Sequence, residues 1–422
     1  MSTFFITKAS APTGRAGHEL CKHGDANFCM IGGYNESGPL AEIWYYDTSI
    51  PWNNDSSNRW IEVMGGVLNK GPLPRVDFSA CVLGNKIYLL GGMESDDKGN
   101  SLIYNDLWSF DLDSKQWCMV EEEAPVSERM GHVAIAIDDD HMIIHGGDCL
   151  GNIFNDTWLY TVSSASWQLI NECNFNIGLG GDIPCGRSAH SACYMEENNT
   201  VVIFGGSAPI DGEFTHFNDF WVLDINAGYD NLKAWKWLQV QASTETNDED
   251  EDNENEEEDD EDEAIFPSPR DMPSILPVST EDGPKLLVLG GFGLKEVSEE
   301  QEQEVEGGGG DKLSNTIETM DEDVVEIGYL GDIWMIGFDG VCTDIDSNLI
   351  SFSKIESNDV ITNTNTNTST ESSEITSTAI AWSNGGCKRG CKLVRTSNGA
   401  IYSFGGFDGE HYCHNLELVE LK

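Results

Sequence analysis

Short apolar runs that each end in a pair of glycines recur six times along this chain. Each run is about four residues long and is bounded by turn-forming residues, which is typical of strands buried on both faces. The second glycines of successive pairs are 59, 55, 59, 85 and 115 residues apart. The shorter spacings lie near the period of about 50 residues that is typical of radial arrays of small sheets. The pairs are Gly32-Gly33, Gly91-Gly92, Gly146-Gly147, Gly205-Gly206, Gly290-Gly291 and Gly405-Gly406.

Each repeat predicts four strands around its apolar run. An arginine-led strand comes first, the apolar strand is second, and an Asn-Asp pair precedes the third strand in the best-preserved repeats. Glycine at the end of the second strand allows a positive φ or a close approach of another backbone. Tryptophans on the third and fourth strands supply wide, flat surfaces for packing one sheet on the next. They are Trp108, Trp158 and Trp221 in the third strands and Trp117, Trp167 and Trp237 in the fourth.

The repeats predict a closed ring, because a four-stranded unit of this kind cannot bury its own faces and neighbouring units must stack. We therefore expect an all-β fold, a six-bladed β-propeller of four-stranded antiparallel blades. The sixth repeat ends one strand short, and residues 2–8 have the pattern of the missing strand, with phenylalanine in place of tryptophan. We expect this N-terminal strand to join the last blade, since the pairing removes an exposed sheet edge.

The glycine pairs and the tryptophans downstream of them resemble the kelch repeat family. The resemblance extends over nearly all of the chain outside three insertions, and six pairs in register are a specific signal. It implies four-stranded blades around a central axis and a stand-alone propeller that binds proteins. The last two repeats depart from the pattern, since Phe352 replaces the fourth-strand tryptophan of the fifth and Leu416-Glu417 replaces the third-strand tryptophan of the sixth.

Three acidic or polar insertions interrupt the later repeats. Residues 243–266 carry 15 acidic and no basic side chains, and residues 294–330 and 355–386 are also poor in basic residues. Segments of this composition cannot bury enough apolar surface to offset the entropy of ordering, so we expect all three to be disordered. Their places between the predicted strands put them on one face of the ring. The chain is then a single propeller domain over residues 1–422 that carries these insertions.

The net charge of −51 restricts the partners that we expect. Binding to phosphate groups needs a basic face, so nucleic acid is excluded as a ligand. No apolar run approaches the ~18 residues of a membrane span, and the start of the chain lacks a secretory pattern. The 12 cysteines are scattered singly and favour buried thiols over a disulfide framework. We expect a monomer located in the cytoplasm or the nucleus.

Six of the eight arginines lead the first strands of the repeats. Arginine takes these places although lysine is more abundant, which favours a role for its planar, directional guanidinium. Three interpretations are open, and the first two can coexist. Each arginine bonds to nearby carboxylates or carbonyls and holds the blades together, or the six form a carboxylate-binding rim at the channel mouth that receives an acidic peptide, or they bind a small anion. They are Arg15, Arg75, Arg129, Arg187, Arg270 and Arg389.

The sequence assigns no catalytic residue, metal or cofactor. It contains no nucleophile elbow, phosphate-binding loop or zinc-protease motif. Cys387, Cys391, His411 and Cys413 flank one repeat, but their spacing is not that of a recognised zinc site. The expected function is a non-enzymatic scaffold or adaptor for protein partners. The alternatives are a propeller enzyme, such as a sugar mutarotase or a specifier-type lyase, and an acidic, histone-chaperone-like protein whose insertions bind basic tails.

Overall fold

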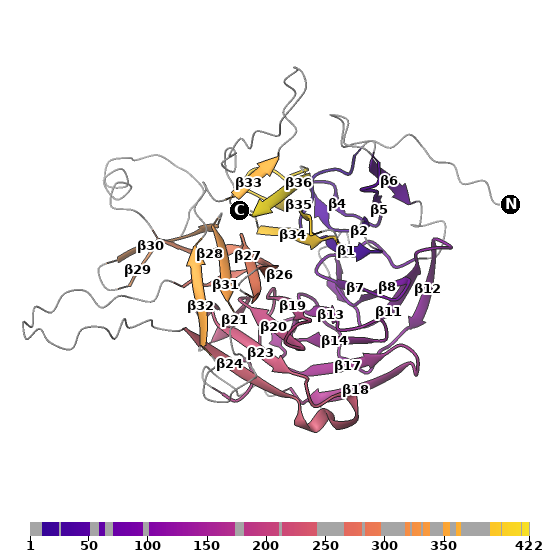
Figure 1. Ribbon diagram of the computed structural model, residues 1–422, viewed down its shortest axis with the longest axis horizontal. Helices are drawn as coiled ribbons and strands as arrows, with labels where there is room; N and C mark the ends of the chain where they lie inside the picture. Colours follow the sequence, from indigo (N-terminus) through magenta and orange to yellow (C-terminus); the bar gives the residue numbers. More distant parts are fainter. Residues whose placement is uncertain are drawn as a thin grey trace, which may run out of the picture.

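Strands built from the six repeats surround a common axis in the computed structural model of the protein (Figure 1). Within the described ranges, no helix has the length and apolar character needed to span a membrane. The structure describes residues 11–24, 27–50, 59–63, 71–95, 101–173, 181–210, 213–242, 266–280, 283–296, 317–320, 323–330, 332–337, 349–354, 360–363, 389–397, 399–414 and 416–421.

The first three repeats each form a separate four-stranded antiparallel sheet, as the sequence pattern predicts. The apolar run is the second strand from the axis, and side chains such as Ile143 and Ile144 are fully buried there. The sheets are, in order from the axis, β1 (Glu19–His23), β2 (Asn27–Ile31), β5 (Ile43–Tyr46) and β6 (Trp60–Val63); β7 (Ser79–Leu83), β8 (Lys86–Leu90), β11 (Leu107–Asp111) and β12 (Gln116–Glu121); and β13 (Val133–Ala136), β14 (His141–His145), β17 (Thr157–Thr161) and β18 (Ser166–Asn171).

The fourth and fifth repeats share one eight-stranded sheet, so five sheets surround the axis and the prediction of six separate blades is wrong. The outer strand β24 pairs in parallel with β32 through Gln241–Leu349 and Ala242–Ile350. β24 has seven residues, longer than the outer strands of the first three sheets, and an unpaired strand edge is a template for such pairing. The order is β19 (Ser191–Met195), β20 (Thr200–Phe204), β23 (Phe220–Asp224), β24 (Lys236–Ala242), β32 (Leu349–Lys354), β31 (Ile333–Gly337), β27 (Gly283–Leu289) and β26 (Ser274–Thr280).

The last sheet combines the sixth repeat with a strand from the third predicted insertion. Its outer strand, β33, lies within residues 355–386, so the expectation of disorder does not hold for that stretch. Residues 2–8, which we predicted in this place, lie outside the described residues. The order is β33 (Val360–Asn363), β36 (Leu416–Leu421), β35 (Ile401–Phe407) and β34 (Arg389–Arg395).

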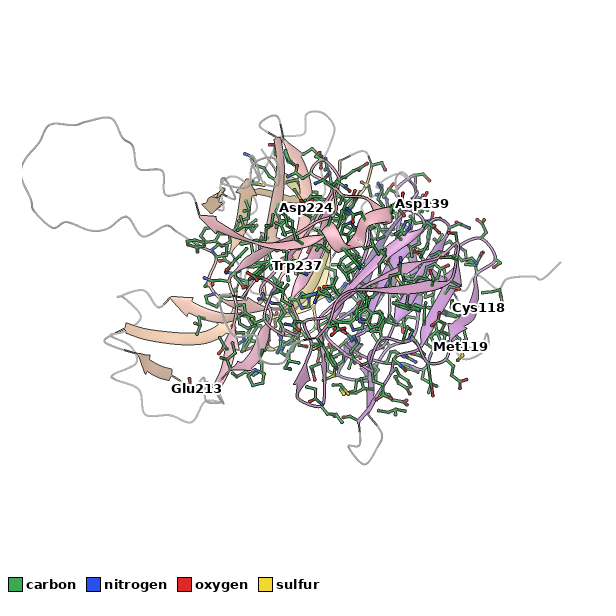
Figure 2. The ribbon with its side chains drawn as sticks, turned by 90° about the horizontal axis from the view of Figure 1, so that it is seen from below. Cys118, Met119, Asp139, Glu213, Asp224 and Trp237 are labelled. Carbon is green, nitrogen blue, oxygen red and sulfur yellow. The ribbon has the colours of Figure 1, made fainter. Side chains whose placement is uncertain are left out.

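Small hairpins connect the second and third strands of the sheets and project from one face of the ring, which we call the hairpin face. Figure 2 places Glu213, on one of these hairpins, on the opposite side of the ring from Asp139 and Asp224, which lie on the turn face. A short 3-10 helix, η3 (Tyr229–Ala234), follows β23. The hairpins are β3 (Tyr34–Asn35) with β4 (Gly38–Pro39), β9 (Met93–Ser95) with β10 (Ser101–Ile103), β15 (Asp148–Cys149) with β16 (Asn152–Ile153), and β21 (Ser207–Ile210) with β22 (Glu213–His216).

The fifth repeat carries a larger structure in the same position. A second four-stranded sheet forms there, and most of it lies within residues 294–330, where we predicted disorder. The described part of this insertion therefore continues the hairpin pattern of the other repeats, while residues 243–265 and most of 355–386 lie outside the described residues. Its order is β25 (Arg270–Asp271), β28 (Phe292–Glu296), β30 (Asp323–Tyr329) and β29 (Ile317–Met320).

The hydrophobic core consists of layers between neighbouring repeats instead of a single centre. One layer joins the first and last sheets, where the rings of Phe28 and Tyr402 have centroids 5.3 Å apart and those of Trp60 and Phe404 are 5.6 Å apart. Aromatic side chains bury large areas. The two ends of the ring are therefore packed on each other through buried aromatic side chains.

Candidate functional site

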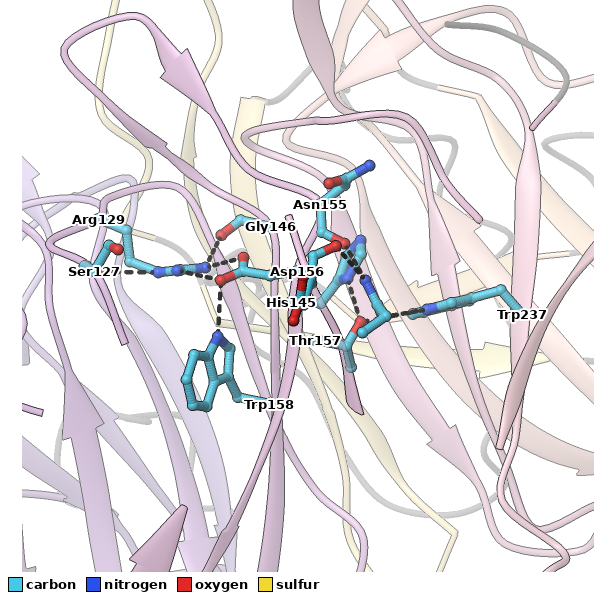
Figure 3. A network of polar contacts seen from close by, with 11 residues as sticks. Ser127, Arg129, His145, Gly146, Asn155, Asp156, Thr157, Trp158 and Trp237 are labelled. Atoms are coloured by element: carbon cyan, nitrogen blue, oxygen red, sulfur yellow. Dashed lines mark hydrogen bonds and ion pairs between the residues drawn. The ribbon is translucent and has the colours of Figure 1, made fainter. Parts of the chain in front are cut away.

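The arginines that lead the repeats form a buried network within each sheet, and Figure 3 shows the third repeat. Arg129 Nη1 donates to Gly146 O and to Asp156 Oδ1, both at 2.8 Å, and Nη2 donates to Asp156 Oδ2 at 2.9 Å. Trp158 Nε1 donates to the same Asp156 Oδ2 at 2.7 Å. The network fixes the start of the first strand to the end of the second and the start of the third. The equivalent ion pairs are Arg15–Glu42, Arg75–Asp106, Arg187–Asp219 and Arg270–Asp332.

These contacts bear on the interpretation of the arginines. The five side chains are between 0 and 3 % exposed. Burial alone would raise the pKa of Asp156. The hydrogen bonds and charge of Arg129, with a further contribution from Trp158, hold that pKa below its ordinary value. Removing one partner from such a buried pair is strongly destabilising. The guanidinium groups of Arg15, Arg75, Arg129, Arg187 and Arg270 are therefore buried in contacts with their own repeats and are not exposed to a partner peptide.

Arg389 differs from the other five because it stands one residue out of register. Six residues with positive φ, which we call the collar, surround the channel mouth, and the arginine precedes its collar residue by two positions in five repeats. Arg389 directly precedes Gly390, so it occupies the place that Asp271 has in the neighbouring repeat. Its side chain is 35 % exposed. The collar residues are Gly17, Asp77, Gly131, Ala189, Met272 and Gly390.

The glycine pairs of four repeats join one repeat to the next. The second glycine, which is Gly92, Gly147, Gly206 or Gly406, donates its N–H to the carbonyl of the next arginine, as Gly147 does to Arg187 at 2.9 Å. The first glycine leaves room for that neighbour, because a Cβ on Gly146 would lie 2.8 Å from both Arg187 O and His190 Cε1. Gly406 donates in the same way to Arg15 O at 2.8 Å, so the last sheet is joined to the first by the contact that joins the others.

The fourth-strand tryptophans also connect neighbouring sheets. Trp167 Nε1 donates to Glu121 Oε2 of the preceding sheet at 3.0 Å. Trp237 Nε1 lies 3.3 Å from Thr157 Oγ1 and from Asn171 Oδ1. Within one sheet, the Trp108 and Trp117 rings meet edge to face with centroids 6.4 Å apart. The glycines and tryptophans singled out in the sequence are thus positioned as structural residues.

The central channel contains a cavity of about 550 Å³ that is lined by residues of all six innermost strands. Lys392 Nζ and Glu19 Oε1, on the neighbouring strands β34 and β1, form an ion pair in its wall at 3.1 Å. Burial, aided by the charge of Arg129, lowers the pKa of His132 to about 3. Groups buried in this way are poorly suited to proton transfer near neutral pH.

The cysteine and histidine residues near the last repeat do not form a shared site. Cys391 is buried in the layer between the last sheet and β26 and β27, whereas His411 is 77 % exposed and Cys413 is half-buried. Cys387 lies outside the described residues. Among the residues that the structure places, no three acidic, histidine or cysteine side chains are grouped so that they could hold a metal ion.

A pocket of about 350 Å³ opens on the hairpin face beside the collar, and we call it the acidic pocket. Three carboxylates line it, from Asp77 of the collar, Asp148 at the start of β15 and Asp271 of β25, together with the guanidinium of Arg389. The charges of Asp77 and Asp148 act on each other, as do those of Asp271 and Asp77. The three carboxylates therefore form one electrostatic group, although they come from three different repeats.

Asp271 is the most buried of the three, with 3 % of its surface exposed. Its Oδ2 accepts a hydrogen bond from Arg389 Nη2 at 3.1 Å and lies 3.8 Å from His216 Nε2. Its Oδ1 has no hydrogen-bond partner among the described residues. Burial raises the pKa of Asp271 to about 6, against the effect of Arg389 and reinforced by Asp77. Burial likewise raises the pKa of Asp77 and of Asp148.

Aromatic rings form a continuous chain along one side of the hairpin face, which we call the aromatic chain. It begins on the β22 hairpin, crosses β28 and β30, passes Phe407 and Tyr412 of the last repeat, and ends on the β3–β4 hairpin of the first repeat, with successive centroids 4.9 to 6.3 Å apart. The guanidinium of Arg389 lies 5.3 Å from the ring of Phe292, within range of a cation–π contact. The members are Phe214, His216, Phe292, Tyr329, Phe407, Tyr412 and Tyr34.

Sequence reasoning missed the acidic pocket and the aromatic chain. Asp271 directly follows Arg270 and Asp148 directly follows Gly147, so both occupy places next to the markers of the repeat. An acidic residue at these two places could have been noticed as a departure from the pattern. The repeat gives no signal that the two carboxylates share one pocket, because that depends on how the hairpins fold over the collar.

Comparisons with known proteins identify the type of repeat. A family model described as the KLHDC2/KLHL20/DRC7 kelch-repeats domain matches residues 3–177. The chain is 31% identical over 168 residues to Kelch domain-containing protein 1 of Mus musculus, which is 37% of this chain and 37% of that protein. It is 28% identical over 245 residues to an F-box/kelch-repeat protein of Arabidopsis thaliana, or 55% of this chain and 45% of that protein. Host cell factor 2 of Homo sapiens is 27% identical over 249 residues, 54% of this chain and 29% of its own length. The matches thus span less than half of each relative.

Proposed function

This chain belongs to the kelch repeat family, and on that premise we propose that it binds partner proteins through the hairpin face of its ring. Relatives with kelch repeats support an interaction role. The fold alone does not decide the function, which depends on the residues of the site.

Exposed apolar side chains on the hairpins are the observation that carries this proposal. Leu102 of β10 is 56 % exposed, Leu150 at the tip of the β15–β16 hairpin 73 %, and Phe214 of β22 66 %. Contiguous exposed apolar surface marks interaction sites, and Phe214 lines one pocket together with Gly151 and Ile153 of the β15–β16 hairpin. The aromatic chain adds half-buried rings and Arg389 beside them, and aromatic residues and arginine are enriched at protein interfaces.

Affinity purification with paired variants tests this proposal. The full chain with Leu150→Ser and Phe214→Ser is compared with a control that carries Met119→Ser and Leu169→Ser, which are exposed on the outer strands β12 and β18. We expect partners captured by the wild type to persist with the control and to be lost with the hairpin variant. Equal capture by both variants would show that binding does not use these hairpins.

We also propose three further features of the chain. Residues 2–8 close the ring, and Arg15 N–H bonds to Cys413 O at 3.2 Å, which supports a chain start beside the last sheet. The insertions at 243–266 and 355–386 attract basic partner segments, as their composition suggests. A reducing intracellular compartment is supported by the ten described cysteines, which form no disulfide with one another and are mostly buried.

A further inference from the structure

We propose that the acidic pocket receives a lysine or arginine side chain of a partner protein. The proposal rests on the function proposed above, because it assigns a chemical class of residue to the partner that docks on the hairpin face. Three observations carry it: the charge of the pocket walls, an unsatisfied buried oxygen, and the apolar surface between the carboxylates.

The charge of the pocket favours a cation. Among the described residues that line it, Asp77, Asp148 and Asp271 are acidic and Arg389 is the one basic residue. The positive charge of Arg389 is already engaged by Asp271 Oδ2 at 3.1 Å. An acidic peptide would meet a surplus of carboxylates here, and like charges brought together at an interface are unfavourable. A basic side chain would offset that surplus.

The free oxygen of Asp271 provides the binding contact. Oδ1 is buried and has no hydrogen-bond partner among the described residues, while Oδ2 is held by Arg389. A buried acceptor that has no hydrogen-bond partner destabilises the folded protein. Asp148 Oδ2 accepts a hydrogen bond from Ser188 Oγ at 3.2 Å, which fixes that carboxylate at the other wall. An ammonium or guanidinium that enters between them would satisfy Oδ1 by a charge-assisted hydrogen bond.

The apolar lining suits the stem of a long side chain. Met130, Ile153, Pro209 and Met272 line the pocket between the carboxylates. Lysine and arginine have an apolar stem that packs on such a surface while the charged head reaches polar groups. Phe214 is 66 % exposed and also lines the pocket, where its ring could contact the entering cation. The volume of about 350 Å³ is sufficient for one side chain and part of its backbone.

Binding of a cation should depend on pH in a defined direction. The pKa of Asp271 is about 6 in the free protein, so its carboxyl is charged at pH 7.5 and gains a proton as the pH falls through 6. The other groups that act on the pocket are Asp77, Asp148, Arg389 and Lys392, with His216 and Tyr34 at its edge. Burial and Arg389 lower the pKa of His216, and its protonation at acidic pH would also oppose a cation. Affinity should therefore fall on acidification.

Peptide pools that differ only in charge test the proposal on the full chain. Randomised octapeptides carry a fixed arginine, lysine, citrulline or norleucine at one central position, and binding is measured by fluorescence polarisation at pH 7.5. We expect the arginine or lysine pool to bind about tenfold more tightly than its neutral counterpart, equivalent to one charge-assisted contact. Equal binding of the charged and neutral pools would overturn the proposal.

Variants separate a specific site from general attraction to an acidic protein. Asp271→Asn and, separately, the half-buried Asp148→Asn should each remove most of the preference for the charged pool. Asp139→Asn makes the same charge change on the exposed β13–β14 turn of the turn face and should preserve it. Melting curves confirm that each variant is folded. If Asp271→Asn does not fold, Asp148→Asn alone tests the pocket. An equal loss with Asp139→Asn would contradict a pocket.

The outcome also distinguishes this proposal from the proposed function. If the Leu150→Ser and Phe214→Ser variant loses its partners while Asp271→Asn and Asp148→Asn retain them, the hairpin face binds proteins without a basic side chain in the pocket. If neither set affects capture, both proposals are wrong.

Discussion

The residue three positions after each repeat arginine shows how burial sets the chemistry of a single side chain. His18, His132 and His190 occupy this place, and Phe78 occupies it in the second repeat. Each of these four side chains packs its Cβ against the second glycine of its own repeat. Its ring lies beside the first glycine of the preceding repeat. The ring nitrogens of the three histidines have no hydrogen-bond partner among the described residues. These histidines therefore act as apolar rings that must stay uncharged.

The first prediction concerns the response of this position to acid. The pKa of His132 is lowered to about 3 in the folded protein by burial and by Arg129, against 6.5 when exposed. Between these values the unfolded chain binds a proton that the folded chain does not, so stability falls as the pH drops below 6.5. The loss for one histidine is about 1.4 kcal/mol at pH 5.5. His132→Phe copies the second repeat and should remove this share of the acid sensitivity.

Urea unfolding of the wild type and of His132→Phe at pH 7.5 and pH 5.5 measures the effect. For each protein, the change in the free energy of unfolding between pH 7.5 and pH 5.5 is measured. The difference between these two changes isolates His132, because the other titrating groups contribute equally to both. An identical change in both would mean that the histidine is protonated in the folded ring.

At the scale of the element, the turn after each second strand determines how one sheet meets the next. Both glycines of a pair have positive φ, for example +65° and +95° at Gly146 and Gly147. Only a residue without a side chain can adopt this backbone so close to the neighbouring arginine and histidine. The hairpins, by contrast, vary in length from repeat to repeat and carry the candidate site, which is typical of connections on a rigid framework.

The second prediction separates the two costs of filling a glycine. Gly146→Ala would strain the backbone and place its Cβ 2.8 Å from Arg187 O and His190 Cε1. Gly84→Ala has a similar φ of +56°, but its nearest neighbour is 3.9 Å away, so it should cost only the ~1–2 kcal/mol of the left-handed conformation. We expect the melting temperature to fall clearly further for Gly146→Ala. Equal melting temperatures would mean that the sheets can separate there at little cost.

At the scale of the whole molecule, the ring joins its two ends by several independent contacts. The Gly406–Arg15 hydrogen bond and the aromatic layer around Phe28 and Tyr402 connect the first and last sheets. The outer edge of β36 pairs with β33, the same edge that residues 2–8 would need. A free sheet edge invites pairing, as the fusion of β24 to β32 also illustrates.

The third prediction concerns which segment pairs with the outer edge of β36, residues 2–8 or β33. If residues 2–8 close the ring, deletion of residues 1–9 should lower the melting temperature by several degrees, since it exposes the edge of β36. Replacement of residues 360–363 by glycine and serine should then have little effect, and it serves as the matched control. The opposite pattern would assign the edge to β33 alone and would end the proposal of N-terminal closure.

The sequence determined the all-β repeat, the kind of strand at each place and the identity of the structural glycines and tryptophans, because these follow from local pattern and period. It also supplied the arginines, but not their role, since each partner carboxylate lies 27 to 62 residues away. Only the tertiary structure decided that five of them are buried, that Arg389 is out of register, and that the fourth and fifth repeats share a sheet. The acidic pocket belongs to the same class of result. Its carboxylates come from three repeats, and the arrangement of those repeats and their hairpins around one axis brings them together.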